Sequence, residues 1–444
     1  MNNNKVNTPD MKPENKRATL PQLRFPEFRG ALEWDEMPFG EICKFTRGPF
    51  GGALKKEIFV KNGYAVYEQS HAIHKNFGSF RYYITEEKFN ELKRFSVLPD
   101  DIIMSCSGTM GKFAIVPRES KKGVINQALL KLTVKKEFDL RFIKATLELS
   151  SNQEKLLSQS AGGAIKNVVS VGQIKEIDLY IPKLREQQKI AECLSSLDDL
   201  LAAHSQKLDT LQDHKKGLMQ QLFPAEGKTL PQLRFPEFQD TPEWEEDDLS
   251  KLSSCGLSNG VFNDPKKVGN GYKLINVLDM YIDTAINEDN LSLLELSRDE
   301  FSRNKVENGD LFFTRSSLVK SGIAYSNIYL GHSNDVTFDG HLIRFRPNKE
   351  IVLPIFVNYL LRTNKVRSQL VARGKTATMT TIGQADVESV KLSFPHIDEQ
   401  QKIADCLSSL DEQITAQTKK IDALNAHKKG LMQQLFPSPD EVHG

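Results

Sequence analysis

The sequence predicts an α+β protein with two mixed α/β domains that are joined by two long helices forming an antiparallel coiled coil. Three observations lead to this fold class. Long segments of the chain occur twice, one repeated segment carries an unbroken heptad pattern, and the regions between the repeats share one order of elements. Because duplicated segments fold alike, we expect an internal pseudo-two-fold repeat.

Three segments are repeated almost letter for letter. The first, TLPQLRFPEF, is followed in both copies by a Glu-Trp pair, which ends at Trp34 and at Trp244. The second reads EQQKIAECLSSLDD from Glu186 and EQQKIADCLSSLDE from Glu399. The third is HKKGLMQQLFP. The repeats divide the chain into two homologous halves, and the copies of the first and third segments are Thr19–Phe28, Thr229–Phe238, His214–Pro224 and His427–Pro437.

The second and third segments together predict one long helix in each half. Apolar residues recur at alternating intervals of four and three, which is the 3.5-residue repeat of a coiled coil. Pro224 and Pro437 end the two helices. The other copy is the simplest partner for such a seam, whereas the alternative is that each helix covers only its own domain. The seam positions are Ile190, Leu194, Leu197, Leu201, Leu208, Leu211, Leu218 and Leu222, then Ile403, Leu407, Leu410, Ile414, Ile421, Leu424, Leu431 and Leu435, with His204, Lys215, Gln417 and Lys428 in the gaps.

The variable regions, Glu36–Pro182 and Glu246–Pro395, differ in sequence but share an order of predicted elements. Each has strand-like runs, an amphipathic helix, a loop of small residues and a last strand that leads into the long helix. One scaffold thus carries two different surfaces. The strand-like runs are Asp101–Gly108, Phe113–Pro117, Gln127–Val134, Asp310–Ser317, Gly322–Ser326 and His341–Pro347, the helices are Asp139–Leu149 and Pro354–Thr363, and the loops are Ser160–Asn167 and Ala372–Thr381.

Repeats and variable regions together predict the division of the chain into consecutive parts. These are a disordered polar tail at 1–18, a first recognition domain at 19–185, a central helix at 186–224, a second recognition domain at 225–398, a distal helix at 399–437 and a tail at 438–444.

Composition limits the classes of protein to consider. The chain has 444 residues, which is too long for one ordinary domain, and its net charge of +1 excludes a polycationic tail as a binding device. No apolar run reaches the roughly 18–20 residues that cross a bilayer, and the polar N-terminus has no secretory signal, so we expect a cytoplasmic protein. The five cysteines show no CxxC spacing, which favours neither a disulfide framework nor a metal site.

Intrinsic catalysis is not expected. A base-flipping methyltransferase needs a cofactor loop and an Asn/Asp-Pro-Pro-aromatic motif, and a nucleotide motor needs GxxxxGK[ST]. RGKT at Arg373–Thr376 approaches the second motif, but Gln369 replaces its first glycine. We therefore expect neither catalytic residues nor a bound metal.

The doubled EQQKIA-CLSSLD helices, the doubled LPQLRFPEF with its following tryptophan, and IPKLREQQKI at Ile181–Ile190 resemble the specificity subunit of Type I restriction–modification systems. The likeness covers the chain from about Thr19 to Pro437. It implies two target recognition domains, each of which reads one half of an asymmetric, bipartite site in double-stranded DNA. It also implies that two methylation subunits dock on the conserved regions and that restriction–translocation subunits can join. By the same resemblance the chain has no catalytic site or cofactor of its own, and S-adenosylmethionine is expected on the methylation subunit.

The repeats alone point the same way. Two nearly identical helical surfaces should recruit two copies of one partner, whereas two diverged domains should bind unequal targets. Two alternatives stay open from the residues. One is a coiled-coil adaptor whose variable domains bind proteins or glycans, and the other is the recognition subunit of a methylation-only defence complex.

Candidate DNA-binding residues lie in equivalent turns and loops of the two halves. Phosphate contacts need Lys, Arg or exposed amides, and base edges favour Arg, Asn, Gln and Lys. Taken singly, each candidate is more simply explained as a solvated surface residue, and it is their recurrence at equivalent loops of both halves that favours DNA binding. In the resembled family the turns and small-residue loops face the DNA. The candidates are Lys55, Lys56, His74, Lys75, Arg81, Ser105, Ser107, Thr109, Lys112, Lys166, Asn167, Asn259, Lys266, Lys267, Arg315, Ser316, Ser317, Lys320, Arg373, Lys375, Thr376 and Thr378.

Overall fold

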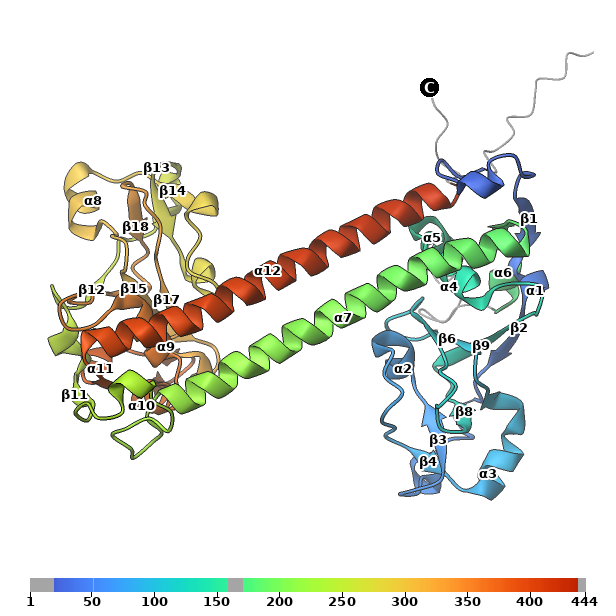
Figure 1. Cartoon of the computed structure of the whole chain (residues 1–444), viewed down its shortest axis with the longest axis horizontal. Coiled ribbons are helices and arrows are strands. Elements are labelled where there is room, and N and C mark those ends of the chain that lie inside the picture. The colour runs from blue at the N-terminus through green and yellow to red at the C-terminus, as the bar shows by residue number, and fades with distance from the viewer. Residues whose placement is uncertain (1–19, 51, 159–170, 438–444) are drawn as a thin grey trace, which may run out of the picture. The chain divides into compact units, whose positions relative to one another are not determined.

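The computed structural model describes residues 20–50, 52–158 and 171–437, which fall into two compact units (Figure 1). Unit 1 contains the described residues up to Ala203 and those from Ile421 onwards, and unit 2 contains His204–Lys420. The division falls inside both long helices. Each unit is therefore built from the early part of one long helix and the late part of the other.

The two long helices are α7 (Leu184–Leu222) and α12 (Ile397–Leu435), and each has 39 residues. Both begin two residues before the predicted Glu186 and Glu399, and both end two residues before the proline. Every predicted seam position is buried or half-buried, while most residues between them are exposed. This alternation is what a two-helix seam produces, because two helices bury only one narrow stripe of each other.

Within unit 2 the helices run antiparallel. The side-chain amide of Gln417 donates a hydrogen bond to the carbonyl oxygen of His204 at 2.7 Å. Asp411, nearer the start of α12, forms an ion pair with Lys215, nearer the end of α7. Two of the gap residues, His204 and Gln417, thus meet each other across the seam, whereas Lys215 meets a carboxylate of the other helix. The antiparallel coiled coil expected from the sequence is confirmed.

The helix segments in unit 1 have the same kind of contact. Lys428 of α12 forms an ion pair with Asp198 of α7. These two residues hold the same places in the repeated helices as Lys215 and Asp411. The lysine that interrupts each apolar seam therefore has a carboxylate partner on the other helix, so its charge is compensated where it is largely shielded from water.

Unit 1 contains two four-stranded sheets and a two-stranded ribbon that leads into α7. The sheet orders are β2-β9-β6-β7 and β4-β3-β8-β5, and β3 and β8 are parallel. The ribbon pairs β1 with β10. The bounds are β1 Asp35–Pro38, β2 Cys43–Arg47, β3 Tyr64–Tyr67, β4 Tyr83–Ile84, β5 Ser96–Val97, β6 Ile102–Ser105, β7 Phe113–Ile115, β8 Gly123–Ile125, β9 Leu129–Val134 and β10 Asp178–Ile181, with helices α1 Phe39–Ile42, α2 Gln69–His74, α3 Glu86–Glu91, α4 Leu140–Glu148, α5 Ser150–Ser158 and α6 Val171–Lys175.

Unit 2 repeats this plan with local additions. Its sheet β12-β19-β15-β17 matches β2-β9-β6-β7, and β13 and β18 form the matching parallel pair beside β14. The ribbon pairs β11 with β22. The bounds are β11 Glu245–Asp248, β12 Ser258–Asn259, β13 Val268–Ile275, β14 Ser292–Leu294, β15 Leu311–Thr314, β16 Ser316–Ser317, β17 Ser326–Ile328, β18 Val336–Phe338, β19 Leu342–Phe345, β20 Lys375–Thr376, β21 Thr380–Thr381 and β22 Lys391–Phe394, with helices α8 Arg298–Asn304, α9 Pro354–Leu361, α10 Asn364–Arg373 and α11 Gln384–Glu388.

The predicted order of elements is confirmed, with two local differences in unit 2. The expected strand at Gly322–Ser326 is displaced toward the C-terminus, because Lys320–Gly322 form a 3-10 turn and Ala324 has a φ of 50°. The expected loop at Ala372–Thr381 contains the short strands β20 and β21. The corresponding loop of unit 1, Ser160–Asn167, lies outside the described residues.

The repeated TLPQLRFPEF segment ties both long helices into each unit. In unit 1 the Arg24 guanidinium donates two hydrogen bonds of 2.7 Å to the buried Glu186 carboxylate at the start of α7. The backbone N–H of Leu23 donates to the carbonyl of Gln434, near the end of α12. One short segment therefore joins the beginning of one helix to the end of the other.

Unit 2 has the same joint with the helices exchanged. Arg234 binds Glu399 of α12 at 2.8 and 2.7 Å, and the N–H of Leu233 donates to Gln221 of α7. The pKa of each of these arginines is raised, chiefly by the hydrogen bonds to its glutamate. Both arginines would be charged without this rise in pKa. Its direction therefore reflects the charge-assisted hydrogen bonds that join each guanidinium to its glutamate.

Each repeated tryptophan packs in an aromatic cluster that includes a phenylalanine from the end of one long helix. Trp34 makes edge contacts with Phe142 of α4 and with Phe436, which follows α12. Trp244 contacts Phe356 of α9 and Phe223, which follows α7. The core of each unit is therefore completed by a phenylalanine from the end of the other copy's helix.

Replacing Arg24 with alanine should destabilise unit 1. The Glu186 carboxylate would stay buried without its partner, so we expect the free energy of unfolding to fall by about 3 kcal/mol. Unit 1 can be followed alone by the fluorescence of Trp34 in a Trp244→Phe background, since the chain has two tryptophans.

The matched control is Lys189→Ala, which removes an ion pair with Glu27 whose side chains are about half exposed. Such a pair contributes less than about 1 kcal/mol. Equal effects of Arg24→Ala and Lys189→Ala on chemical denaturation would contradict the role given to the Arg24 joint.

Candidate nucleic-acid interface

A small three-stranded sheet brings the candidate loops of unit 2 together. Strand β21 pairs with β16 on one side and with β20 on the other. Ser317 and Thr376 both lie opposite Thr380, and Ser316 and Lys375 both lie opposite Thr381. Loops more than fifty residues apart in the sequence thus form one surface. Of the candidates, it carries Arg315, Ser316, Ser317, Lys375, Thr376 and Thr378.

Asn259 joins this surface from the end of β12. Its side-chain amide contacts both the side chain of Gln384 and the carbonyl oxygen of Gly340. The Arg315 guanidinium donates to the same Gly340 carbonyl at 2.9 Å. Asn259, Arg315 and Gln384 are half-buried and held together, so their planar groups are oriented in advance for recognition of a ligand.

Gln384 is a residue that the sequence reasoning missed. A Gly-Gln pair occurs at Gly172-Gln173 and again at Gly383-Gln384, in both cases at the start of a short helix. This doubled pair is shorter than the other repeats and lies inside the variable regions. A search for short matches at equivalent places in the two halves could have found it.

Arg373 and Lys375 are close in sequence but have different surroundings. The Arg373 guanidinium donates to the hydroxyl and the carbonyl of Ser389 and to the carbonyl of Gln369. Its hydrogen-bonding capacity is largely used to hold α10 to the residues after α11. The Lys375 side chain is 76% exposed and forms an ion pair with Asp386 at 3.1 Å. Lys375 is thus the better placed of the two to meet a phosphate.

The other basic candidates of unit 2 are exposed. Lys266 and Lys267 end the 3-10 turn Pro265–Lys267, which Asp264 caps through a hydrogen bond to the N–H of Lys266. Lys320 begins the turn after β16. Their exposed ammonium groups fit phosphate contacts rather than a fixed recognition geometry.

In unit 1 the turn between β6 and β7 has two glycines in the left-handed region, Gly108 and Gly111. Ser107, Thr109 and Lys112 are exposed on this turn. Ser105 is fully buried, and its hydroxyl accepts a hydrogen bond from the N–H of Lys112 at 3.0 Å. The structure therefore gives Ser105 a part in shaping the turn, and we leave it out of the proposed contact surface because its side chain has no exposed atoms.

Another basic candidate of unit 1, Lys56, lines a hollow of about 260 Å³ together with Tyr82 and Gln127. Arg81 lies over the ring of Tyr82, with its guanidinium carbon 4.8 Å from the ring centre. Lys55 is exposed beside Lys56.

A separate position at the end of α2 carries His74 and Lys75. Lys75 has a left-handed φ of 54°, and its ammonium nitrogen lies 3.8 Å from a carboxylate oxygen of Glu148. Lys166 and Asn167 fall outside the described residues. The candidates of unit 1 thus lie on the turn after β6, on the end of α2 and around the hollow.

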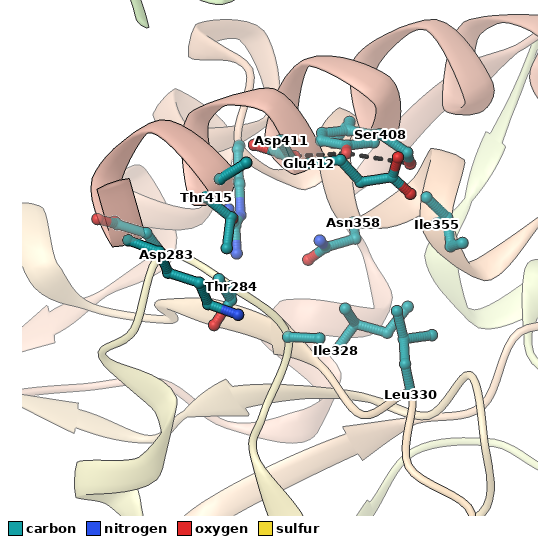
Figure 2. Close-up of a pocket in the computed structure, with 15 residues that line it drawn as sticks. Asp283, Thr284, Ile328, Leu330, Ile355, Asn358, Ser408, Asp411, Glu412 and Thr415 are labelled. Atoms are coloured by element: carbon teal, nitrogen blue, oxygen red, sulfur yellow. Dashed lines mark hydrogen bonds between the residues drawn. The ribbon is translucent and has the colours of Figure 1, made fainter. Parts of the chain in front are cut away.

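A separate pocket of about 430 Å³ lies in unit 2 between α9, α12 and the loop at Asp283–Ala285 (Figure 2). The Tyr359 hydroxyl donates to the Asp411 carboxylate at 2.6 Å, and Asp411 also pairs with Lys215. Burial and the Asp411 hydrogen bond raise the pKa of Tyr359, so it stays a neutral donor. Tyr359, Asp411 and Lys215 are thus engaged with one another, which fits a joint between α9 and the helix pair.

Two further findings concern the described part of the chain as a whole. Its helices include none that is both long and apolar enough to cross a membrane. Among the same residues, no cluster of His, Cys, Asp and Glu side chains has the arrangement of a metal site.

Two diverged domains on one duplicated helical frame define a protein that recognises two targets with a shared scaffold. Residues 32–213 and 261–426 match the family described as Type I restriction modification DNA specificity domain. These matches cover most of the chain, and the chain belongs to this family. Its role is DNA sequence specificity, with two recognition domains.

Individual relatives are distant in sequence but similar along their length. The specificity subunit of the Type I restriction enzyme MjaVIII from Methanocaldococcus jannaschii is 24% identical over 420 residues, which are 93% of each chain. The specificity subunit of the Type I restriction enzyme EcoKI from Escherichia coli is 25% identical over 300 residues, which are 66% of this chain and 63% of that one.

Solved structures share the fold. The S subunit of a Type I restriction–modification system from M. genitalium superposes with a TM-score of 0.59 and 16% identity, over 94% of this chain and 99% of that one. A chain from a study of complex assembly and conformational transition of the Type I R-M system has a TM-score of 0.52 and 15% identity, over 91% and 98%. At such identities the likeness concerns the fold alone.

The different surroundings of Lys375 and Arg373 lead to a testable separation of their roles. Lys375→Ala should weaken DNA binding about tenfold or less, lower the slope of log affinity against log salt by about 0.9, and leave the unfolding temperature unchanged. Arg373→Ala should lower the unfolding temperature, because the carbonyls of Gln369 and Ser389 lose their donor. The measurements are DNA titrations at several salt concentrations and thermal unfolding. An unchanged salt slope for Lys375→Ala would contradict its assignment to phosphate.

Proposed function

We propose that this chain reads an asymmetric, bipartite site in double-stranded DNA, with unit 1 reading one half-site and unit 2 the other. The observation that carries the proposal is the contrast between constant and diverged contacts. The Arg24–Glu186 and Arg234–Glu399 joints are the same in both units, whereas the loops that carry the candidate residues differ. A shared frame with different reading loops suits two different half-sites.

The constant parts of the chain are the proposed docking surfaces for two copies of a methylation subunit, which restriction–translocation subunits can join. Each TLPQLRFPEF segment exposes the same two leucines: Leu20 and Leu23 in unit 1, and Leu230 and Leu233 in unit 2, with exposed fractions of 39–43%. Equal surfaces bind equal partners. We propose that this chain is itself non-catalytic, that its partners bind S-adenosylmethionine and carry out methylation, and that the complex works in the cytoplasm.

The experiment that tests this function is a map of methylated bases across the genome of a host with and without this chain. Two short sequences separated by a gap of constant length should be methylated only when the chain is present. Methylation that is independent of the chain, or that follows one continuous site, would overturn the proposal.

Exchange of the first variable region, Glu36–Pro182, for that of another family member should change one half-site and leave the other half unchanged. The reason is that the candidate loops of unit 2 draw on residues from Asn259 to Gln384, none of which is exchanged. The same genome-wide mapping reads the result. The matched control exchanges Glu246–Pro395 and should alter the other half-site. A site changed in both halves by either exchange would contradict separate readout.

A further inference from the structure

Two phenylalanines are unusually exposed in the loops that leave the first strand of each matching sheet. Phe50 follows β2 and has 95% of its surface exposed, and Phe262 follows β12 and has 78% exposed. Burial of a phenylalanine stabilises the fold, so exposure has an energetic cost. A single exposed phenylalanine is nevertheless common on protein surfaces and needs no explanation. Here, however, one such phenylalanine is exposed in each unit.

Strand register shows that the two phenylalanines occupy equivalent places. Arg47, the last residue of β2, pairs with Leu130, which in turn pairs with Met104 of β6. Asn259, the last residue of β12, pairs with Ile343, which pairs with Phe313 of β15. Arg47 and Asn259 are therefore counterparts. Phe50 and Phe262 each lie three residues further along the chain.

The glycine between strand and phenylalanine is also the same in both units, for a steric reason. A Cβ atom on Gly48 would lie 1.8 Å from the carbonyl oxygen of Asn126, and one on Gly260 would lie 2.0 Å from that of Phe338. Both strands therefore end where their backbone lies against the carboxyl end of a strand in the neighbouring sheet, β8 in unit 1 and β18 in unit 2. The close approach fixes the point from which each phenylalanine leaves the sheet.

Each exposed phenylalanine is followed by a pair of exposed lysines. Lys55 and Lys56 come after Phe50, and Lys266 and Lys267 come after Phe262; in both cases the pair enters or forms a 3-10 turn. The segments read FGGALKK and FNDPKK. An exposed apolar ring followed within a few residues by two exposed lysines suits a polyanion that also offers apolar surface, and the stacked bases of DNA within their phosphate backbone have this combination.

We propose that Phe50 and Phe262 are apolar wedges, each of which inserts against a base step of its own half-site while the following lysine pair binds the adjacent phosphates. This inference rests on the proposed function and adds residues that act by unstacking rather than by hydrogen bonding. The sequences of the variable regions have diverged around the two phenylalanines. An apolar wedge makes no hydrogen bond to a base edge, so the same residue can serve two half-sites of different sequence.

The test uses the full chain assembled with its methylation subunits and the duplex identified by methylation mapping. 2-Aminopurine replaces one adenine at a time in each half-site, and its fluorescence rises where a base step is unstacked. Wild-type complex should raise the fluorescence at one step in each half. Phe50→Ala should abolish the rise in one half and Phe262→Ala in the other, and each should weaken binding about tenfold.

Two controls separate a wedge from a structural or electrostatic role. Leu32→Ala and Leu278→Ala remove similarly exposed apolar side chains, 77% and 82% exposed, from units 1 and 2 and should bind as wild type does. Phe50→Trp should restore the fluorescence change. The slope of log affinity against log salt should be unchanged in Phe50→Ala, because no phosphate contact is lost, whereas Lys266→Ala should lower it by about 0.9.

Three results distinguish the ways in which the inference could fail. Wild-type complex that binds this duplex no better than a scrambled one would overturn the proposed function itself. Specific wild-type binding with unchanged fluorescence and affinity in both phenylalanine variants would overturn the wedge alone. Loss of methylation subunits from the variant complexes, seen by size-exclusion chromatography, would assign the two rings to a protein contact and also overturn it.

Discussion

The antiparallel pairing of α7 and α12 is the constraint on which the rest of the structure depends. Neither unit is complete with its own copy of the long helix alone. Unit 1 needs Phe436 from the end of α12 beside Trp34, and unit 2 needs Phe223 from the end of α7 beside Trp244. A single polypeptide thus makes the contacts that a homodimer would make by exchanging equivalent elements. The ion pairs Lys215–Asp411 and Lys428–Asp198 fix which residues face each other.

This dependence explains why some parts of the chain are nearly identical while others have diverged. Each joint contacts the long helices of both copies. Arg24 pairs with Glu186 of its own copy, and the neighbouring Leu23 binds Gln434 of the other copy's helix, so a change in the joint must suit both helices. The candidate loops take no part in these joints, and their sequences differ between the two units. In unit 2, for example, two loops that are distant in sequence form the β16-β21-β20 sheet. The same frame can therefore carry new specificity without a change in its assembly.

The pair of long helices could be predicted from the sequence almost residue by residue. A heptad repeat predicts both which face of a helix is buried and that another helix buries it. The strands were found where apolar runs are long, as in β9 and β15. The candidate interface is harder to predict, because its geometry is set by tertiary contacts. Arg373 and Lys375 look alike in sequence, and only the Ser389 and Gln369 contacts show that the first supports a helix. The equivalence of Phe50 and Phe262 follows only from the strand register and from the exposure of both side chains.

The most direct test of the helix pairing is a cross-linking measurement that distinguishes antiparallel from parallel alignment. Cysteines replace Lys215 and Asp411 in one variant, and Lys215 and its counterpart Lys428 in another, after the partly or fully exposed Cys193, Cys255 and Cys406 are changed to serine. A short bis-maleimide should join 215 to 411 rapidly, which alters gel mobility, and should leave the second variant unjoined. Efficient joining of 215 to 428 without joining of 215 to 411 would mean that the helices lie parallel, which would contradict the architecture described above.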